Sequence, residues 1–266
     1  MAKYFRYFPK IEYNGVSVTD ITRRVKVAEK LQADPYLFLP YTVTNDDRAE
    51  DIAQLYYGDV NKVWMIYLAN NIIDPYTQWP LSNEKFESTI RKKYAHSISF
   101  AGDKVNVSSN RITSTAHGFK TTDPVIYTGS PVIGGLANNA TYYIIRVNSN
   151  IIKLATSATN ARNGTAINIT TTTNNTITHS LALNVDTFLS STLIDTNVVY
   201  CTKNADPTIK ISYDTYRLGD VVTGEWTLVR VYEYETQENE NRRTIFLINT
   251  DYAQRVEKDL KSLMNV

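Results

Sequence analysis

The residues able to do acid–base or metal chemistry are few and scattered in this chain of 266 residues. Its histidines, His96, His117 and His179, lie in no HExxH motif, and the single cysteine, Cys201, completes no ligand set with them. A zinc site needs three or four such ligands at short, characteristic spacings. The sequence therefore predicts no metal site, and we expect each histidine in a turn or at the surface.

One group of carboxylates lies close together in the sequence and is the strongest candidate for catalysis. Paired carboxylates act as general acid and base in glycosidases when a nonpolar environment raises the pKa of one of them. The alternative is a solvated loop, or a charged rim that fixes the register of a partner. No apolar residue flanks Glu238 or Glu240, which favours the loop or rim. The group consists of Glu233, Glu235, Glu238, Glu240, Arg242 and Arg243.

The common nucleotide and hydrolase motifs do not occur in the chain. GxSxG, GxGxxG and GxxxxGK[ST] are all missing, which removes the usual hydrolase, dinucleotide-binding and P-loop interpretations. The sequence thus predicts a protein that is not an enzyme and that holds no cofactor.

The composition favours protein contacts over nucleic acid or membrane. Charged residues make up 21% and the formal net charge is +1, so no strong field attracts an anionic partner. The N-terminal residues lack a secretion signal, and the longest apolar run, Val63 to Ala69, is too short to span a bilayer. Nineteen tyrosines against three methionines suit interfaces, because tyrosine offers contact area with few rotatable bonds. We expect a soluble protein made and kept in a cytoplasm until assembly or release.

The segment from Tyr56 to Ser82 predicts the elements that would position a contact surface. Gly58 ends one helix, and Asp59 caps the next by accepting backbone N–H bonds. The apolar stripe of that second helix consists of Val60, Val63, Trp64, Tyr67 and Leu68, at helical spacing.

An aromatic, proline-rich turn follows this helix. Asn70-Asn71 stops the helix, Asp74-Pro75 turns the chain, and Trp79-Pro80 leads to a new cap at Ser82. Trp64 lies in the stripe and is expected in the core. Trp79 is expected as an exposed anchor in a rigid loop; stacking on a sugar and filling the core of the helix pair remain alternatives.

The remaining elements of the first 94 residues follow from short patterns. Residues 8 to 13 predict a strand closed by an Asn14-Gly15 turn. A strand over residues 37 to 43 is followed by a capping-box-like pair, Thr44 and Asp47. Apolar spacing predicts two further buried helix faces: Ala49, Ile52, Ala53 and Tyr56, and then Phe86, Ile90 and Tyr94.

From about residue 97 the composition changes to Thr, Asn, Ser and short β-branched runs separated by turn residues. This spacing is typical of a small sandwich or barrel, with strands expected over residues 104–107, 124–127, 142–147, 151–154 and 166–169. The last part of the chain predicts strands over 198–202, 209–213, 226–234 and 244–248, a loop over 235–243, and a final helix capped at Thr250 or Asp251.

The predicted fold is therefore α+β, with an all-β domain inserted between two halves of a smaller protein. Its parts are an N-terminal arm (1–36), a helical domain (37–96), the inserted β domain (97–180) and a mixed β segment ending in a helix (181–266).

The helical domain resembles a LysM module. That module has a YTV strand, a helix beginning around D-xx-IA, and a second helix ending in a Leu/Asn pair. A proline-glycine turn and a return strand would then follow, but here Asp74-Pro75-Tyr76 and Gln78-Trp79-Pro80-Leu81-Ser82 replace them, followed by a helix. The matching residues are Tyr41-Thr42-Val43, Asp51-Ile52-Ala53-Gln54-Leu55-Tyr56-Tyr57-Gly58-Asp59, Trp64 and Leu68-Ala69-Asn70-Asn71.

With its flanking segments, this pattern resembles the LysM-like baseplate wedge subunit of T-even-type contractile-tailed phages, the gene-product-fifty-three family. The combination YYGD, Trp64, NNIIDPY, WPLS and a helix ending in Lys93-Tyr94 carries the likeness, with an arm over 4–13 and a C-terminal portion over 232–248. The inserted segment is similar to a β module found in phage structural proteins, through Ala116-His117-Gly118-Phe119, Thr122-Asp123-Pro124-Val125, Gly134-Gly135-Leu136, Thr141-Tyr142-Tyr143-Ile144-Ile145 and Ile152-Lys153-Leu154-Ala155.

The resemblance implies a structural protein of the virion tail baseplate, present in multiple copies in a six-fold assembly. Its implied partners are other wedge proteins: a wedge-ring protein, a sheath-initiator-like wedge protein and neighbouring wedges. The aromatic arm, the rigid loop and the basic pair supply the predicted partner-interface residues: Tyr4, Phe5, Tyr7, Phe8, Asp74, Pro75, Tyr76, Trp79, Pro80, Arg242 and Arg243.

Two other functions remain open from the sequence. The LysM resemblance and the aromatic residues suggest a peptidoglycan- or glycan-binding module of a phage tail protein. The inserted β domain suggests an adhesin, although we expect it to brace or decorate the assembly.

Overall fold

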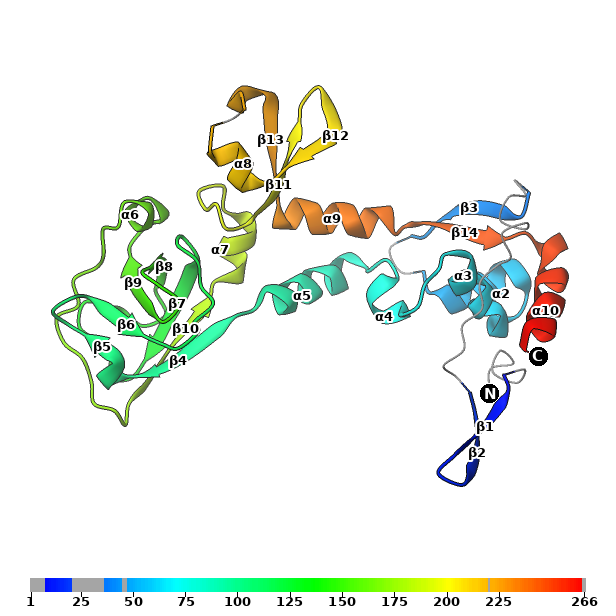
Figure 1. Cartoon of the computed structure of the whole chain (residues 1–266), viewed down its shortest axis with the longest axis horizontal. Coiled ribbons are helices and arrows are strands. Elements are labelled where there is room, and N and C mark those ends of the chain that lie inside the picture. Colours follow the sequence, from blue (N-terminus) through cyan, green and yellow to red (C-terminus); the bar gives the residue numbers. More distant parts are fainter. Residues whose placement is uncertain (1–7, 21–35, 45–46, 220, 265–266) are drawn as a thin grey trace. The chain divides into compact units, whose positions relative to one another are not determined.

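The chain is described by a computed structural model over residues 8–20, 36–44, 47–219 and 221–264. In these residues helices alternate with antiparallel sheets (Figure 1), so the expected α+β class is confirmed. The chain divides into two compact units, one of Met1–Phe86 with Gln237–Val266 and one of Glu87–Thr236. Residues 237–266 thus belong with the N-terminal unit. The four-part division expected from composition stays a prediction.

The first unit begins with a β-hairpin. β1 (Lys10–Tyr13) pairs with β2 (Val16–Thr19), with Tyr13 opposite Val16. Asn14 and Gly15 have positive φ values of 49° and 76°, which a two-residue hairpin turn requires. The expected turn is confirmed.

Two strands from opposite ends of the chain form a second sheet of this unit. β3 (Phe38–Thr42) pairs in antiparallel fashion with β14 (Thr244–Ile248), and Leu39 lies opposite Leu247 (Figure 1). Apolar residues of both strands pack against the following helices and exclude water, which is the main favourable term for this unit. This core contains Val43, Ile52, Ala53, Ile66, Ile245 and Leu247.

The helices over this sheet end at the expected residues, but the first of them begins later than expected, with Arg48 at its N-cap and not the Thr44–Asp47 pair. α2 (Ala49–Tyr57) ends at Gly58, whose φ is 70°. Asp59 then accepts the N–H of Asn61 (2.9 Å) and caps η2 (Val60–Lys62), which continues as α3 (Val63–Ala69). The predicted cap is confirmed, although the first turn is a 3₁₀ turn. Trp64 and Leu68 pack against the core formed with α10 (Thr250–Met264).

Two segments expected to lack regular structure are helical. The Asp74-Pro75 turn begins α4 (Pro75–Gln78), because Asp74 caps it and proline suits the first helical position. The expected loop over 235–243 lies mostly in α9 (Val231–Asn241). The expectation of a loop was wrong because Glu and Gln are good helix formers and this stretch has neither Gly nor Pro. The final helix is capped by Asn249, which accepts the N–H of Asp251 (3.1 Å).

The second unit contains a seven-stranded antiparallel sheet in the order β4-β10-β7-β8-β9-β6-β5. Its end strands, β4 and β5, are joined by the three residues of η3. Six flat strand spacings would separate them by about 29 Å, whereas such a connection spans only about 13 Å, so the sheet curls around its core. The elements are α5 (Asn83–Tyr94), which runs in from the first unit, β4 (Ser97–Ala101), η3 (Gly102–Lys104), β5 (Val105–Asn106), β6 (Arg111–Thr113), β7 (Pro124–Gly129), β8 (Thr141–Arg146), β9 (Ile151–Ala155), α6 (Ala158–Arg162) and β10 (Thr178–Leu183).

One expected strand of this sheet is missing. Over residues 166–169 the backbone bonds to unrelated partners: Ile167 N–H to the carbonyl of Leu154 (2.8 Å) and Ile169 N–H to the Asn110 side chain (2.8 Å). Because these partners do not belong to one neighbouring strand, residues 166–169 form no β-ladder. The side chain of Ile169 is nevertheless buried.

Two histidines belong to the core of the second unit, contrary to the expectation of turn or surface positions. His117 and His179 are 1% and 0% exposed. Each ring nitrogen has a partner: His117 contacts the carbonyl of Asn148 (2.8 Å) and accepts Phe119 N–H (3.1 Å). A ring satisfied on both sides can be buried neutral.

A three-stranded sheet completes this unit, in the order β12-β11-β13. Two expected strands end earlier than predicted. The strand expected over 226–234 ends at Arg230, one residue before α9 begins, and the strand expected over 209–213 ends at Ile211. The elements are α7 (Val185–Ser190), β11 (Val198–Lys203), β12 (Asp206–Ile211), α8 (Tyr213–Arg217), η4 (Thr223–Glu225) and β13 (Trp226–Arg230).

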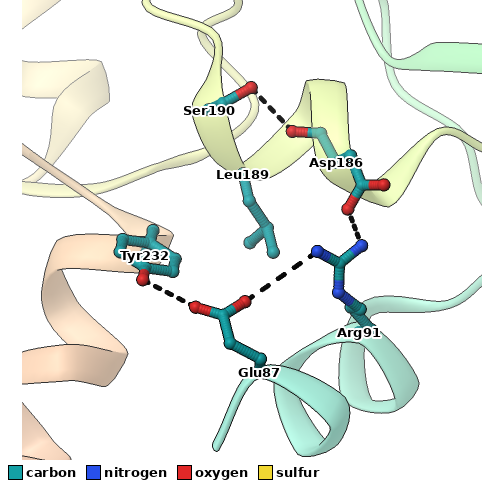
Figure 2. A pocket seen from close by; sticks show the side chains of 6 residues that line it. All are labelled: Glu87, Arg91, Asp186, Leu189, Ser190 and Tyr232. Atoms are coloured by element: carbon teal, nitrogen blue, oxygen red, sulfur yellow. Dashed lines mark hydrogen bonds and ion pairs between the residues drawn. The ribbon is translucent and has the colours of Figure 1, made fainter. Parts of the chain in front are cut away.

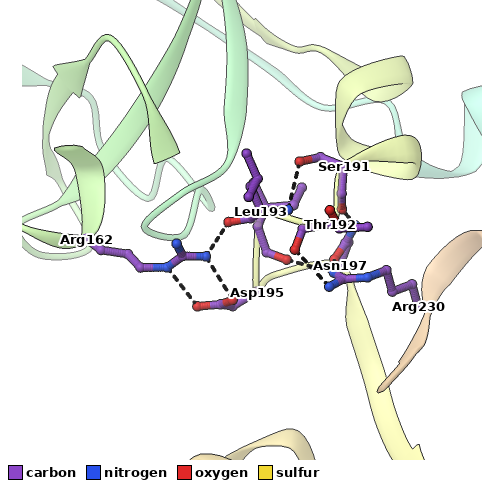
Figure 3. Close-up of polar contacts among 8 residues, drawn as sticks. Arg162, Ser191, Thr192, Leu193, Asp195, Asn197 and Arg230 are labelled. Carbon is purple, nitrogen blue, oxygen red and sulfur yellow. Dashed lines mark hydrogen bonds and ion pairs between the residues drawn. The ribbon is translucent and has the colours of Figure 1, made fainter. Parts of the chain in front are cut away.

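A hydrogen-bonded loop joins this sheet to the rest of its unit (Figure 3). Arg230 donates to the carbonyls of Thr192 and Ile194 (both 2.9 Å). Arg162, on α6, pairs with both carboxylate oxygens of Asp195 (3.0 and 3.1 Å). The buried amide of Asn197 donates to the carbonyls of Phe188 (2.8 Å) and Ser191 (2.9 Å).

Candidate functional site

The predicted partner-interface residues fall into three groups in the structure. Tyr4, Phe5 and Tyr7 lie outside the described residues. Phe8, just before the hairpin, is buried. The other seven converge on one segment of the first unit, Ile73–Leu81, which we call the α4 segment. It contains Asp74, Pro75, Tyr76, Trp79 and Pro80, and the end of α9 brings Arg242 and Arg243 to it.

The α4 segment is held internally by two polar side chains. Asp74 accepts the N–H of Tyr76 (3.0 Å) and the hydroxyl of Thr77 (2.8 Å). The Gln78 side-chain oxygen accepts the N–H groups of Ile73 (2.6 Å) and Asp74 (3.0 Å). The bond to Tyr76 satisfies an N–H donor in the first turn of the short helix, which an isolated turn would leave to water, and the other bonds tie the preceding residues to the helix.

The end of α9 fixes the same segment from outside. The Asn239 side chain pairs with both backbone groups of Leu81, at 2.8 Å to its N–H and 3.1 Å to its carbonyl. Arg242 donates to the carbonyl of Thr77 (2.8 Å), and Arg243 pairs with Glu240 (2.8 Å). The basic pair therefore has partners within the chain itself.

Trp79 is half-buried rather than exposed. Its indole N–H donates to the carbonyl of Asp47 (3.1 Å), and its ring meets Tyr67 edge to face at 6.3 Å. It packs against the core of the β3–β14 sheet, and Pro80 beside it is buried. This was one alternative left open by the sequence, namely core filling for the helix pair.

The large apolar residues that the α4 segment presents to solvent are Tyr76 and Ile73, which are 92% and 66% exposed. Ile73 was missed in the sequence. It directly precedes the capping residue Asp74, where an apolar side chain usually packs on the fourth helical residue. Here that residue is Gln78, so Ile73 has no apolar side chain of the helix to pack on. This polar residue at the fourth helical position is the feature of the sequence from which the exposure of Ile73 could have been predicted.

Two titratable groups near this segment have pKa values that are shifted away from neutral pH. Burial, followed by the charge of Glu50, raises the pKa of Tyr67 to about 12. The backbone N–H of Thr44 lowers the pKa of Asp47. Among the described residues, no three His, Cys, Asp or Glu side chains gather closely enough to bind a metal ion together.

The hairpin offers a second apolar surface. Strand alternation places Ile11, Tyr13, Val16 and Val18 on one face. Their side chains are 36% to 65% exposed. An isolated two-stranded hairpin is only marginally stable in water, so a covering partner would stabilise it.

A shallow depression in the second unit carries charges that neutralise one another (Figure 2). Glu87 accepts the hydroxyl of Tyr232 (2.7 Å) and faces Arg91 at 4.0 Å. Arg91 also pairs with Asp186. Since each charge already has a partner, the depression offers no evident ligand site.

None of the helices that the structure describes has the length and hydropathy that crossing a bilayer requires.

Comparison with known proteins gives two agreeing matches. The family model described as base plate wedge protein 53 matches residues 3–111. The baseplate wedge protein gp53 of Enterobacteria phage T4 is 30% identical over 98 residues, which cover 33% of this chain and 50% of that protein. The chain thus spans about half the length of the curated relative that it matches.

The matched region contains the hairpin, the β3–α3 elements, the α4 segment and α5. It is also the region in which the sequence resemblance was strongest. Residues 3–111 of this chain are thus similar to the base plate wedge protein 53 family.

Proposed function

We propose that this protein is a structural subunit of a phage tail baseplate wedge, which clamps wedge proteins and joins neighbouring wedges through protein–protein contacts. The family match supports a structural role in the baseplate. The observation that carries the contact role is the α4 segment, where a network of hydrogen bonds holds a 92% exposed tyrosine in place. Because the segment is already ordered, binding freezes little additional motion.

The partners we propose are other wedge proteins: a wedge-ring protein, a sheath-initiator-like wedge protein and adjacent wedges in a six-fold assembly. Tyr76 and Ile73 would enter an apolar pocket of one of them, and the apolar face of the hairpin would cover a second surface. Exposed aromatic anchors on rigid segments are frequent hot spots in such interfaces.

We further propose that β3, α2, α3 and β14 form the LysM-like module. The return strand missing after α3 in the sequence would be β14, which pairs with β3. The segment between α3 and β14 would then be an insertion into the module.

The test is the double variant Ile73→Ser/Tyr76→Ala in wedge assembly from purified proteins. We expect its association with the wedge to weaken by about 30-fold, as hot-spot residues do when truncated. Leu218→Ala, which truncates a residue 74% exposed at the end of α8, is the matched control and should assemble normally. Unchanged assembly of the double variant would contradict the role of the α4 segment. Trp79→Ala is a poorer test, because Trp79 is part of the core.

A glycan-binding function is the second candidate, favoured by the exposed ring of Tyr76 beside the Tyr67–Trp79 pair. A pull-down of the whole chain on purified peptidoglycan decides it. Retention lost in Tyr76→Ala would support this function, and no retention of the unchanged chain would exclude it.

A further inference from the structure

The β3–β14 sheet of the first unit has one edge that side chains close and one open edge. Val43 N–H bonds to the carbonyl of Arg243, and Asn249 N–H to that of Leu37 (both 2.8 Å). In an antiparallel pair, residues alternate between bonding to the partner strand and pointing away from it. The odd-numbered residues of β3 therefore bond to β14, and the backbone groups of Phe38, Pro40 and Thr42 point to the outer edge.

Side chains close the outer edge of β14. Asn70 donates to the carbonyl of Phe246 (2.8 Å) and accepts its N–H (2.7 Å), as a neighbouring strand would do. Tyr57 donates its hydroxyl to the carbonyl of Ile248 (3.0 Å). No further strand can pair with β14 without displacing these bonds.

The outer edge of β3 has no such closure in the described part of the chain. β3 is the terminal strand of its sheet, and Pro40 and Thr42 are exposed. Strand edges usually carry charged residues or a proline that hinder pairing with other chains, and β3 has only the proline, Pro40. The exposed edge strand β12 follows this rule with Asp206 and Lys210, whereas β3, with the sequence FLPYT, has no charge.

An apolar side chain of β3 itself could contact an added strand, since Leu39 is 39% exposed. Phe246, on the far strand β14, is 46% exposed. Phe38 meets Phe246 edge to face, with ring centroids 6.2 Å apart. Pro40 offers a carbonyl but no N–H, so the donors of the open edge are the amides of Phe38 and Thr42.

We propose that the outer edge of β3 receives an extended segment of a partner protein as a third strand. A row of donors and acceptors at every second residue is complemented by another extended backbone, and such strand addition is a common mode of peptide recognition. The inference rests on the proposed function in one respect: the partner is another protein of the baseplate.

Hydrogen exchange at single-residue resolution tests this proposal, on the full chain alone and in complex with the other wedge proteins of its phage. In the free chain, the outward amides of Phe38 and Thr42 should exchange fast, and the inward amides of Leu39, Tyr41 and Val43 should exchange slowly. In the complex, we expect Phe38 and Thr42 to exchange at least about 100-fold more slowly. The three inward amides are internal controls.

A complex that forms while both outward amides still exchange fast would overturn the inference and leave the proposed function intact. Failure to form any complex would overturn both. Pro40→Thr provides an independent check, since it restores a donor at the centre of the edge. It should slow dissociation of the complex several-fold, and faster dissociation with an unchanged fold would count against strand addition.

Discussion

At the scale of single residues, the buried histidine His179 shows how polar groups specify the core of the second unit. Its Nδ1 lies 2.8 Å from the Tyr127 hydroxyl, and its Nε2 lies 2.7 Å from the Thr173 hydroxyl. The Tyr127 hydroxyl also accepts the N–H of Ile133 (3.0 Å). This chain of bonds ties two loops to the sheet through a neutral ring.

Burial lowers the pKa of His179 from its ordinary value of 6.5. The unfolded chain therefore takes up this proton more readily than the folded one, and the stabilising contribution is complete above pH 6.5 and is lost as the pH falls toward the folded pKa. We expect the free energy of unfolding to decrease between pH 7 and pH 5, and to decrease less in His179→Gln. Denaturant titrations across this range measure how steeply the free energy of unfolding changes with pH in the unchanged protein and in His179→Gln. The same pH dependence in both would contradict the role of His179.

The burial of His179 could not be predicted from its neighbours in the sequence. Its partners lie 6 and 52 residues away along the chain, and only the curled sheet brings them together. Asp59 is the opposite case. It bonds to the N–H two residues ahead, so residue type and position sufficed to predict its role.

At the scale of elements, the Asn70 side chain makes the hydrogen bonds at the outer edge of β14 that a neighbouring strand would otherwise make. Removing its amide in Asn70→Ala leaves the N–H and carbonyl of Phe246 without these bonds. We expect the free energy of unfolding of the first unit to fall by about 1–3 kcal/mol, because two hydrogen bonds that each contribute about 0.5–1.5 kcal/mol are lost.

Chemical denaturation monitored through the tryptophans of this unit measures the effect of Asn70→Ala. Gln54→Ala on the exposed face of α2 is the control, with an expected change within about 0.5 kcal/mol. If both variants unfold at the same denaturant concentration, Asn70 does not stabilise β14.

Helix α9 shows why polar segments are hard to assign from sequence. Residues 235–241 have no continuous apolar stripe, so periodicity gave no helix signal. In the structure, Glu235 accepts hydrogen bonds from Lys93 (2.6 Å) and Tyr94 (2.7 Å) on α5. Long-range contacts of this kind add to the intrinsic helix propensity.

At the scale of the whole molecule, the first unit is built from both ends of the chain. Ile245, Leu247 and Ile248 are each no more than 3% exposed and lie in cores that they share with residues of the first 86. A chain ending at Thr236 would leave these cores open to water. Each lost aliphatic side chain would cost about 2–5 kcal/mol, against a total stability of about 5–15 kcal/mol.

We therefore expect the chain truncated after Thr236 to lose the fold of its first unit and to keep that of the second. Circular dichroism and the fluorescence of Trp64 and Trp79 monitor the first unit, and protease resistance of residues 87–236 monitors the second. Full-length Leu247→Ala should destabilise the first unit strongly and Phe246→Ala weakly, because only the former side chain is buried. A truncated chain with an intact first unit would refute the prediction.

The sequence by itself determined the local structure and the resemblance to a family. The Asn14-Gly15 turn, the Gly58 helix end, the Asp59 cap and the strand over 244–248 depend on residues close together in the chain, and the family resemblance rests on continuous strings. Only the tertiary structure decided that β14 pairs with β3, that Trp79 is half-buried, and that Asn239 and Arg242 hold the α4 segment. These contacts join residues more than 30 positions apart, and their stability comes from packing and desolvation, which local patterns do not encode.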